Sequence, residues 1–412
     1  MFGKKADASL IHGSVAPGFE GVEAQFRENF ERRGELGTAC AIYCQGKKVV
    51  DLWGGYRDSK TRAPWEEDTL VLVFSATKGL ASMTLAVANS RGLLDYDERV
   101  AAYWPEFAAE GKGETTVRQL LSHQAGLCVP DEPVDPTMLA NPDLLARMLA
   151  RQQPLWEPGT KHAYHAFSLG WYEGELIRRV DPHHRTLGRF FQDEIAKPLG
   201  LEFYIGLPAD IPGSRIATLK MFGVLDFFFL KSRTSEMSLP FLKSMADKQS
   251  LAARAFAHSK RSDLSDRAFL ALENPAYTGV GQVRSIARAY SAFAIGGSEL
   301  GITSRTLEAL TGPPVLPTLG TYDEMLRVEV IYSLGFMRPS KGVDFGVSGK
   351  AFGTAGAGGS FGFADPDAGV GYAYAPNRMG LYLFDDPREK ALRDAFYEGL
   401  KKLPKDEWRR AS

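Results

Sequence analysis

The chain has 412 residues, of which 44% are hydrophobic and 24% are charged, with 49 basic and 50 acidic side chains. This composition is that of a globular protein with a sizeable core, and the formal net charge of −1 argues against a nucleic-acid binder, which would carry a basic surface. No run approaches the roughly 18 apolar residues of a spanning helix, and residues 1–19 lack the apolar core of a secretory signal. We therefore expect no membrane span and a cytoplasmic protein.

The first predicted elements are a helix and a strand hairpin. Apolar residues at helical spacing predict a surface helix over 19–34, and residues 38–44 and 48–53 indicate two strands joined by a turn at 45–47. A helix is predicted over 75–92, with Ser75 near its start, and another over 116–122. From about residue 143 to residue 295 the pattern is mostly helical, with loops that contain proline and glycine.

Strand patterns return after about residue 311. Residues 328–334, 342–347, 369–375 and 379–383 are predicted strands, and 386–403 is a predicted amphipathic helix. The simplest packing joins the N- and C-terminal strands into one antiparallel sheet flanked by the terminal helices, which is an α+β fold. We expect one domain over 1–412, with an α/β lobe from 20–80 and 311–403 and a helical lobe from 81–310. A cleft between the lobes is a natural place for a site.

Ser75 and Lys78 form the pattern Ser-x-x-Lys at the start of the predicted helix. Residues three apart lie on one helix face, so the hydroxyl and the amine can meet. A serine becomes nucleophilic when a base takes its proton, and a lysine serves as that base only when it is held neutral. The helix N-terminus and the apolar residues 71–74 favour that state. This pattern is common by chance, and taken alone it is better explained by an N-cap serine beside an exposed lysine.

Further motifs accompany the pair in a fixed order: LLSHQAGL at 120–127, WEPGT at 156–160, Tyr164-His165-Ala166, and FGTAGAGGS at 352–360. Together they resemble the serine β-lactamase and penicillin-binding-protein superfamily, and most of all the class C β-lactamase-related esterases called family VIII carboxylesterases. The resemblance extends over about residues 20–400 and implies a β-lactamase/transpeptidase-like fold.

The resemblance also implies roles for individual residues. Ser75 would be the acylated nucleophile, Lys78 its base, and Tyr164 a partner in proton transfer. The backbone N–H groups of Ser75 and Ala357 would form the oxyanion hole, with Ala357 on a strand edge that faces the cleft. The remaining substrate-binding residues would be Thr354, Ala355, Gly356, His165 and Ala166.

Two positions depart from the family pattern. Ala166 replaces the asparagine of Tyr-x-Asn, and Thr354 replaces the lysine of Lys-Thr-Gly. Since those groups hold the amide and carboxylate of an antibiotic, their loss favours hydrolysis of short- to medium-chain carboxylic esters, without a metal or an organic cofactor. The alternatives are β-lactamase or D-alanyl peptidase-like activity, and a catalytically silent relative used for binding or assembly. A homo-oligomer is left open.

Competing signals are weaker. Residues 358–362 match the Gly-x-Ser-x-Gly elbow around Ser360, but a turn follows where that motif needs a helix. His123 lacks a triad carboxylate, and His183-His184 lacks a third metal ligand. Cys40, Cys44 and Cys128 are expected to be reduced core residues. The apolar stretch 221–230 could wall an acyl pocket, form a dimer contact or be part of the core.

Overall fold

The computed structural model describes residues 10–222, 235–258, 264 and 266–404. The larger of its two sheets has eight antiparallel strands in the order β1-β3-β2-β11-β10-β9-β8-β7. Pairing of β2 with β11 joins the N-terminal and C-terminal strands in one sheet, as predicted. The strands are β1 (Ile11–Val15), β2 (Gly37–Cys44), β3 (Lys47–Gly55), β7 (Ile331–Ser333), β8 (Phe336–Arg338), β9 (Phe352–Ala355), β10 (Phe361–Asp365) and β11 (Val370–Pro376).

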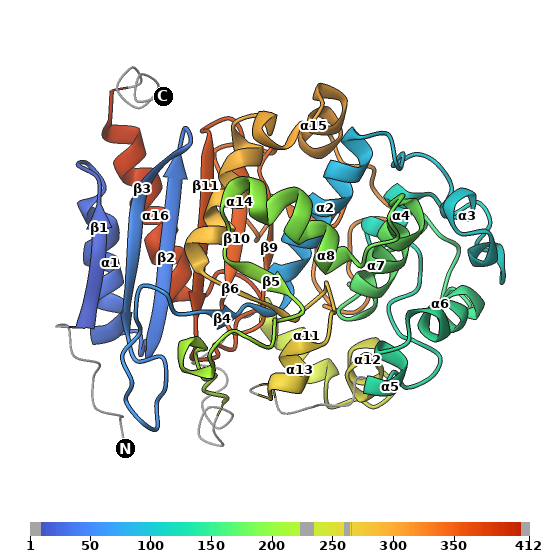
Figure 1. Cartoon of the computed structure of the whole chain (residues 1–412), viewed down its shortest axis with the longest axis horizontal. Helices are drawn as coiled ribbons and strands as arrows, with labels where there is room; N and C mark the ends of the chain where they lie inside the picture. Colours follow the sequence, from blue (N-terminus) through green and yellow to red (C-terminus); the bar gives the residue numbers. More distant parts are fainter. Residues whose placement is uncertain (1–9, 223–234, 259–263, 265, 405–412) are drawn as a thin grey trace.

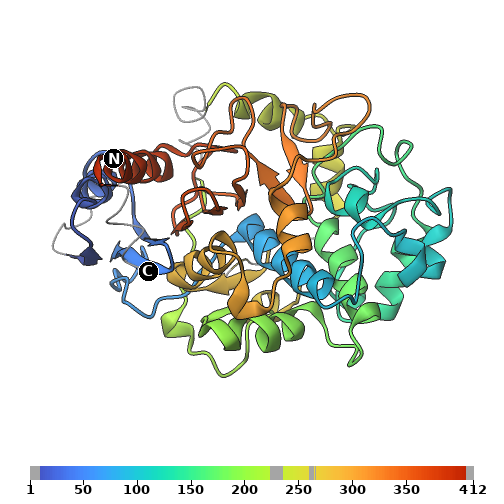
Figure 2. The ribbon, with the colours of Figure 1, turned by 90° about the horizontal axis from the view of Figure 1, so that it is seen from above.

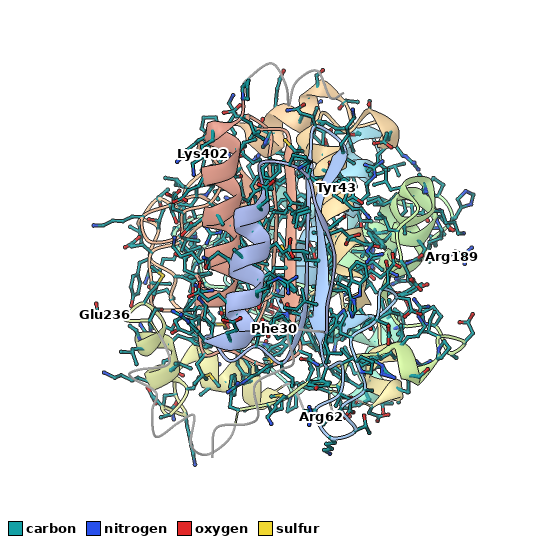
Figure 3. The ribbon with its side chains drawn as sticks, turned by 90° about the vertical axis from the view of Figure 1, so that its left-hand side faces the viewer. Phe30, Tyr43, Arg62, Arg189, Glu236 and Lys402 are labelled. Atoms are coloured by element: carbon teal, nitrogen blue, oxygen red, sulfur yellow. The ribbon has the colours of Figure 1, made fainter. Side chains whose placement is uncertain are left out.

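Helices cover both faces of this sheet. The terminal helices α1 (Glu20–Glu31) and α16 (Pro387–Lys402) pack side by side over one face (Figures 2 and 3), and both confirm the sequence prediction. Helix α14 (Val283–Ala294) packs on the other face, against β2, β10 and β11 (Figure 1). The central strand β2 is therefore buried on both sides, which explains its nearly continuous run of small and apolar residues.

The β2–β3 hairpin follows from its turn residues. Gln45 and Gly46 both adopt positive φ, at 50° and 78°, which is the geometry of the two-residue turn that matches the twist of the paired strands. The predicted hairpin is confirmed.

Helix α2 (Thr77–Ser90) lies between the sheet and the helical lobe (Figure 1). Every residue from Thr77 to Ala88 is buried, so α2 is a central core helix rather than an amphipathic surface helix. Its neighbours include α7, α8, α15 and strand β9. The other helices are α3 (Val100–Tyr103), α4 (Val117–Leu121), α5 (Pro136–Leu139), α6 (Pro142–Arg151), α7 (Ser168–Val180), α8 (Leu187–Phe191), α9 (Lys197–Leu199), α11 (Ser238–Ser244), α12 (Leu251–His258), α13 (Arg267–Ala271) and α15 (Ser304–Thr311).

A second sheet connects the helical lobe to the start of α2. It has three short antiparallel strands in the order β4-β6-β5, namely β4 (Val71–Leu72), β6 (Gly279–Gly281) and β5 (Phe203–Ile205). The N–H of Val73 donates to the carbonyl of Gly279 over 3.0 Å. The loop that precedes β6 is thereby held beside Ser75.

Two predicted strands are wrong. Residues 342–347 form a loop, because Gly342 and Gly346 adopt positive φ and the N–H of Val347 bonds to the Asp365 carboxylate. Residues 379–383 make a single bridge, between Gly380 and Gly358. Strands β1, β4, β5, β6, β8 and β10 were not predicted, and β9 was implied only by the expected place of Ala357 on a strand edge. Most of the apolar stretch 221–230 lies outside the described residues.

Within the described part of the chain, no helix is both long and apolar enough to span a membrane. In that same part, no three histidine, cysteine or acidic side chains gather where they could hold a metal ion. Cys40, Cys44 and Cys128 are buried free thiols.

Candidate active site

Ser75 lies in a 3-10 turn, Phe74–Ala76, that leads directly into α2. Phe74 adopts a left-handed backbone conformation, with φ of 48°, which is strained for a bulky residue. The turn is held by the Thr77 hydroxyl, which donates to the carbonyl of Phe74 and accepts from the N–H of Gly279. As a result, the Ser75 side chain is partly exposed while the residues after it are buried.

Lys78 is buried directly beneath Ser75, with 1% of its surface exposed. Its Nζ lies 3.2 Å from Ser75 Oγ, 2.8 Å from the carbonyl oxygen of Ala166 and 2.9 Å from that of Ala276. Within the described residues no carboxylate lies within ion-pair distance of this amine. The structure therefore brings the Ser75 hydroxyl and the Lys78 amine into contact, as their spacing predicted.

These three contacts suit either charge state of Lys78, because an ammonium can donate to all three oxygens, including Ser75 Oγ, and a neutral amine can donate to the two carbonyls. A neutral amine has two N–H donors and one lone pair, and carbonyl oxygens can only accept. In the neutral state the two carbonyls take the two N–H groups, and the lone pair is left to accept the Ser75 hydroxyl proton. Burial lowers the pKa of Lys78 to about 7, with Glu173 acting in the opposite direction. A lysine with this pKa is a free base for much of its time at neutral pH.

Tyr164 stands next to both groups. Its ring centroid lies 4.7 Å from Lys78 Nζ, and its hydroxyl hydrogen-bonds with Ser75. Burial raises the pKa of Tyr164, and the Ser75 hydrogen bond only partly offsets this. Tyr164 therefore holds its proton at neutral pH and can donate it, which suits a group that protonates a departing alcohol.

Strand β9 brings the glycine-rich motif against the nucleophile turn. Gly356 has no room for a side chain, because a Cβ there would lie 2.3 Å from the carbonyl oxygen of Val73 and 3.0 Å from the backbone nitrogen of Ala76. Ala357 follows in an exposed turn after β9 ends, so its expected place on a strand edge is wrong. Ala355 is partly exposed beside it.

Thr354 does not face the solvent. It is 4% exposed, and its hydroxyl donates to the carbonyl of Ala76 and bonds with the Tyr290 hydroxyl over 3.1 Å. The nearby Lys350 pairs with Asp367 at the surface, at 2.9 Å, and so does not replace the missing cation.

The two residues that follow Tyr164 support the site from behind. His165 has no exposed surface; its Nε2 accepts from the N–H of Leu127, which leaves Nδ1 to donate to the carbonyl of Ala163. His165 therefore packs behind the site and is not exposed to bind substrate directly, whereas the resemblance implied that it would be. Ala166 is nearly buried, and its contribution is the carbonyl bound by Lys78.

His123 and Ser360 are both occupied by structural contacts. Nδ1 of His123 accepts from the N–H of His165, so this lone pair is unavailable for a proton. Ser360 is 4% exposed, and its hydroxyl donates to the carbonyl of Val73 over 2.8 Å. Strand β10 follows Ser360, and the hydrolase elbow would need a helix there.

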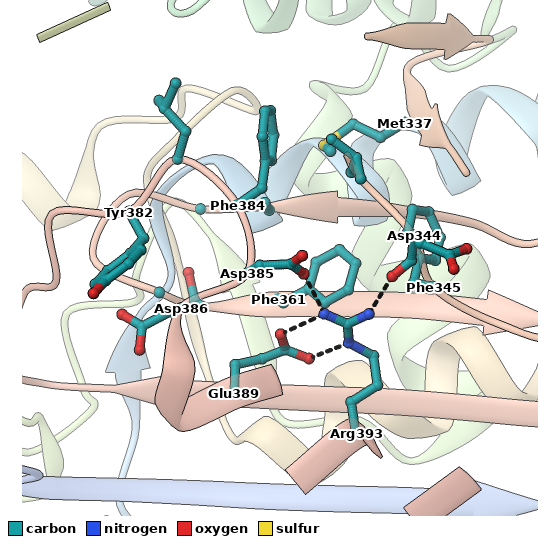
Figure 4. Close-up of a pocket in the computed structure, with 16 residues that line it drawn as sticks. Met337, Asp344, Phe345, Phe361, Tyr382, Phe384, Asp385, Asp386, Glu389 and Arg393 are labelled. Carbon is teal, nitrogen blue, oxygen red and sulfur yellow. Dashed lines mark hydrogen bonds and ion pairs between the residues drawn. The ribbon is translucent and has the colours of Figure 1, made fainter. Parts of the chain in front are cut away.

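A small pocket adjoins β9 at Ala355 and Gly356 (Figure 4). Its floor is ionic: Arg393 donates to Glu389, to Asp385 and to the carbonyl of Asp344. It has room for little more than one water molecule, so we assign it no ligand.

Some site residues have no sequence signal. Ala276 contributes a backbone carbonyl from a loop about 200 residues after Lys78, which no side-chain pattern can reveal. Glu173 is a buried acid near Lys78 on helix α7. Its only mark in the sequence is that it is an acid within an apolar stretch.

The fold and this geometry are those of a serine hydrolase, in which a serine hydroxyl, a buried lysine amine and a tyrosine ring are brought together. Comparison with known proteins agrees, since residues 22–395 match the Beta-lactamase family and the chain belongs to it. Esterase/beta-lactamase LipL of Mycobacterium tuberculosis is 34% identical over 381 residues, which cover 90% of this chain and 83% of LipL.

Solved structures give the same relationship. A family VIII carboxylesterase is 38% identical and superposes with a TM-score of 0.82, over 94% of this chain and 99% of its own. A penicillin-binding protein homologue from Caulobacter crescentus is 35% identical, with a TM-score of 0.80 over 94% of this chain and 99% of that one. The β-lactamase/transpeptidase-like fold implied by the sequence motifs is confirmed.

Proposed function

We propose that the protein is a serine hydrolase that cleaves short- to medium-chain carboxylic esters through an acyl-enzyme on Ser75. The observation that carries this proposal is the 3.2 Å contact between Ser75 Oγ and the buried amine of Lys78, whose pKa burial lowers to about 7. The names of the related carboxylesterase and of LipL support the ester as substrate.

Acylation begins when Ser75 Oγ attacks the ester carbonyl carbon and its proton passes to the lone pair of Lys78. The carbonyl oxygen becomes an oxyanion, which the N–H groups of Ser75 and Ala357 stabilise in this proposal. The intermediate then collapses and the bond to the alcohol oxygen breaks. The alcohol leaves with the Tyr164 proton, and Lys78 returns a proton to Tyr164, so the charges balance.

Deacylation uses the same groups in reverse. Water attacks the acyl carbon as its proton passes to Tyr164, which gives its own proton to Lys78. The bond between the acyl carbon and Ser75 Oγ then breaks, Lys78 returns a proton to Ser75 Oγ, and the acid leaves. Metal and cofactor are not needed for any of these steps.

Neutral esters fit the site better than β-lactams. The cationic position of the family is the buried Thr354, whose hydroxyl is already bonded to Ala76 and Tyr290. A substrate carboxylate would therefore find no cation there. The three buried free thiols support a reducing compartment such as the cytoplasm.

The decisive test is the intact mass of the protein after exposure to a short-chain alkyl phosphonate ester. We expect one adduct on Ser75 and turnover of p-nitrophenyl butyrate, both absent in Ser75→Ala. Absence of an adduct and of turnover in the wild type would favour the silent binding relative. Faster hydrolysis of nitrocefin than of the p-nitrophenyl esters would favour the β-lactamase.

A further inference from the structure

Glu173, on α7, is a fully buried acid that the proposed mechanism does not use. Its Oε1 accepts from the Ser82 hydroxyl over 3.1 Å, and its Oε2 has no hydrogen-bond partner among the described residues. The turn between β7 and β8 closes over this contact at Gly335, where a Cβ would lie 1.9 Å from Ser82 Oγ and 3.3 Å from Glu173 Oε1. An unpartnered buried oxygen is costly and calls for an explanation.

Its position relative to Lys78 suggests one. Ser82 is four residues after Lys78 on α2, so the two side chains are neighbours along one face, about 6 Å apart at Cβ. The Glu173 carboxyl therefore lies about one helical turn from the catalytic amine, near enough to interact with its charge but not bonded to it.

Lys78 is the cation that interacts with this carboxyl. The other titratable groups that interact with Glu173 are Tyr96 and Tyr164, and burial raises the pKa of both phenols, so they stay neutral. The neighbouring acid Glu175 is different, because Arg178 and Arg179 both pair with it. Among the groups that interact with Glu173 in the described structure, Lys78 is therefore the one whose positive charge its carboxylate can stabilise.

We propose that Glu173 is a positioning residue whose carboxylate stabilises the ammonium that Lys78 becomes when it takes the Ser75 proton. This inference rests on the proposed function, since it concerns the acylation step. Charge that develops in a dry site is stabilised strongly by a fixed charge of opposite sign nearby.

The effect should grow with pH. Burial lowers the pKa of Lys78 to about 7 and raises that of Glu173 to about 8, and each group partly offsets the shift of the other. Rising pH therefore first frees the Lys78 amine and then ionises Glu173. The carboxylate makes Lys78 a stronger base, so acylation should accelerate at this second step.

The experiment measures the single-turnover rate of Ser75 acylation by p-nitrophenyl butyrate from about pH 6 to about pH 10. Glu173→Gln should match the wild type at the acid end. At the alkaline end it should be slower by on the order of tenfold, which corresponds to about one pKa unit in the base. Ser82→Ala should move the second rise to higher pH, because it removes a hydrogen bond that favours the carboxylate.

Glu175→Gln is the matched control, on the same helix, and should change stability without changing the shape of the pH profile. A constant ratio between wild type and Glu173→Gln across the pH range would overturn the proposal and indicate a structural role. Difference infrared spectroscopy gives a readout independent of turnover. The protonated-carboxyl band that Glu173→Gln removes should disappear over the same pH range in which acylation of the wild type makes its second rise; a band that persists through that range would also overturn the proposal. Failure of the wild type to acylate would instead refute the proposed esterase.

Discussion

Two buried groups of charges in this molecule are built in opposite ways. Beside α16, Arg388 pairs with Asp386 at 2.8 Å and with Glu35 at 3.3 Å, and the following turn pairs Arg393 with Glu389 at 2.9 Å. At the active site, Lys78 and Glu173 are equally buried, but no ion pair within the described structure includes either one.

The pKa values follow from this difference. Burial lowers the pKa of Arg388, but its carboxylate neighbours and Tyr374 raise it well above the ordinary value, so the charge is permanent. Burial of Lys78 without a paired carboxylate lowers its pKa to about 7. The paired charges around Arg388 are therefore permanent and support the fold. Lys78, which has no paired carboxylate, instead changes its protonation state near neutral pH, as a catalytic base must.

The largest expected effect is a loss of esterase activity, without loss of the fold, when Lys78 in the active-site region is replaced. Lys78→Met should lower kcat/KM for p-nitrophenyl butyrate by on the order of 10³ or more, because the Ser75 proton loses its acceptor. The fold should be retained, since methionine fills a similar apolar volume. Wild-type stability should rise relative to Lys78→Met from pH 7 to pH 10, where the unfolded lysine binds a proton that the folded one does not. Denaturation at both pH values, with esterase assays, tests this; an active variant would contradict it.

The next effect concerns stability. Arg388→Met leaves Glu35 and Asp386 buried without their counter-charge, and should lower the free energy of unfolding by about 3–5 kcal/mol. The rate at neutral pH can fall, because Arg388 also donates to the carbonyl of Gly358 beside Ala357. In the folded fraction, the acid side of the pH profile should keep its midpoint, because Arg388 contacts neither Ser75 nor Lys78. Chemical denaturation measures the loss, and a shift of this midpoint would show that the two regions are coupled.

A smaller effect is the fall in the acylation rate at low pH. Acylation requires neutral Lys78, so the rate should fall by about tenfold for each pH unit well below about 7, as Lys78 becomes protonated. Pre-steady-state kinetics with p-nitrophenyl butyrate measures this fall. A midpoint near the ordinary pKa of lysine would mean that burial does not hold the amine neutral.

The smallest effect is at Thr354. Thr354→Val removes a hydroxyl bonded to Ala76 and Tyr290, and should cost about 1 kcal/mol of stability. Since the side chain is turned away from the cleft, kcat/KM for esters should change by less than about threefold. A large loss of activity with normal stability would instead place Thr354 in contact with substrate.

Much of this architecture could be predicted from the sequence. Periodicity alone found α1, the β2–β3 hairpin and α16, since each has a clear apolar face or turn. Ser75 and Lys78 were found by their spacing together with the accompanying motifs. The strands predicted at 342–347 and 379–383 fail because glycines with positive φ and single bridges interrupt apolar runs that resemble strands.

The features that escaped prediction depend on distant contacts. The carbonyls of Ala166 and Ala276 bind Lys78 whatever their side chains are, and the burial of His165 depends on residues 120–127 folding over it. Backbone acceptors and burial depth leave no trace in residue identity, so neither could be read from one sequence.

The small sheet β4-β6-β5 determines which parts of this protein can change in length during evolution. The pairing of Ile205 with Gly279 fixes both ends of the long excursion over residues 206–278 next to the nucleophile. Because closing a longer loop costs little extra entropy, length changes in its exposed described connections, outside the buried residues of α12 and α13, should be tolerated while the Ala276 carbonyl stays in place. Exposed connections within residues 206–278 can therefore change during evolution and alter substrate preference. The geometry around Ser75 can stay the same while they do.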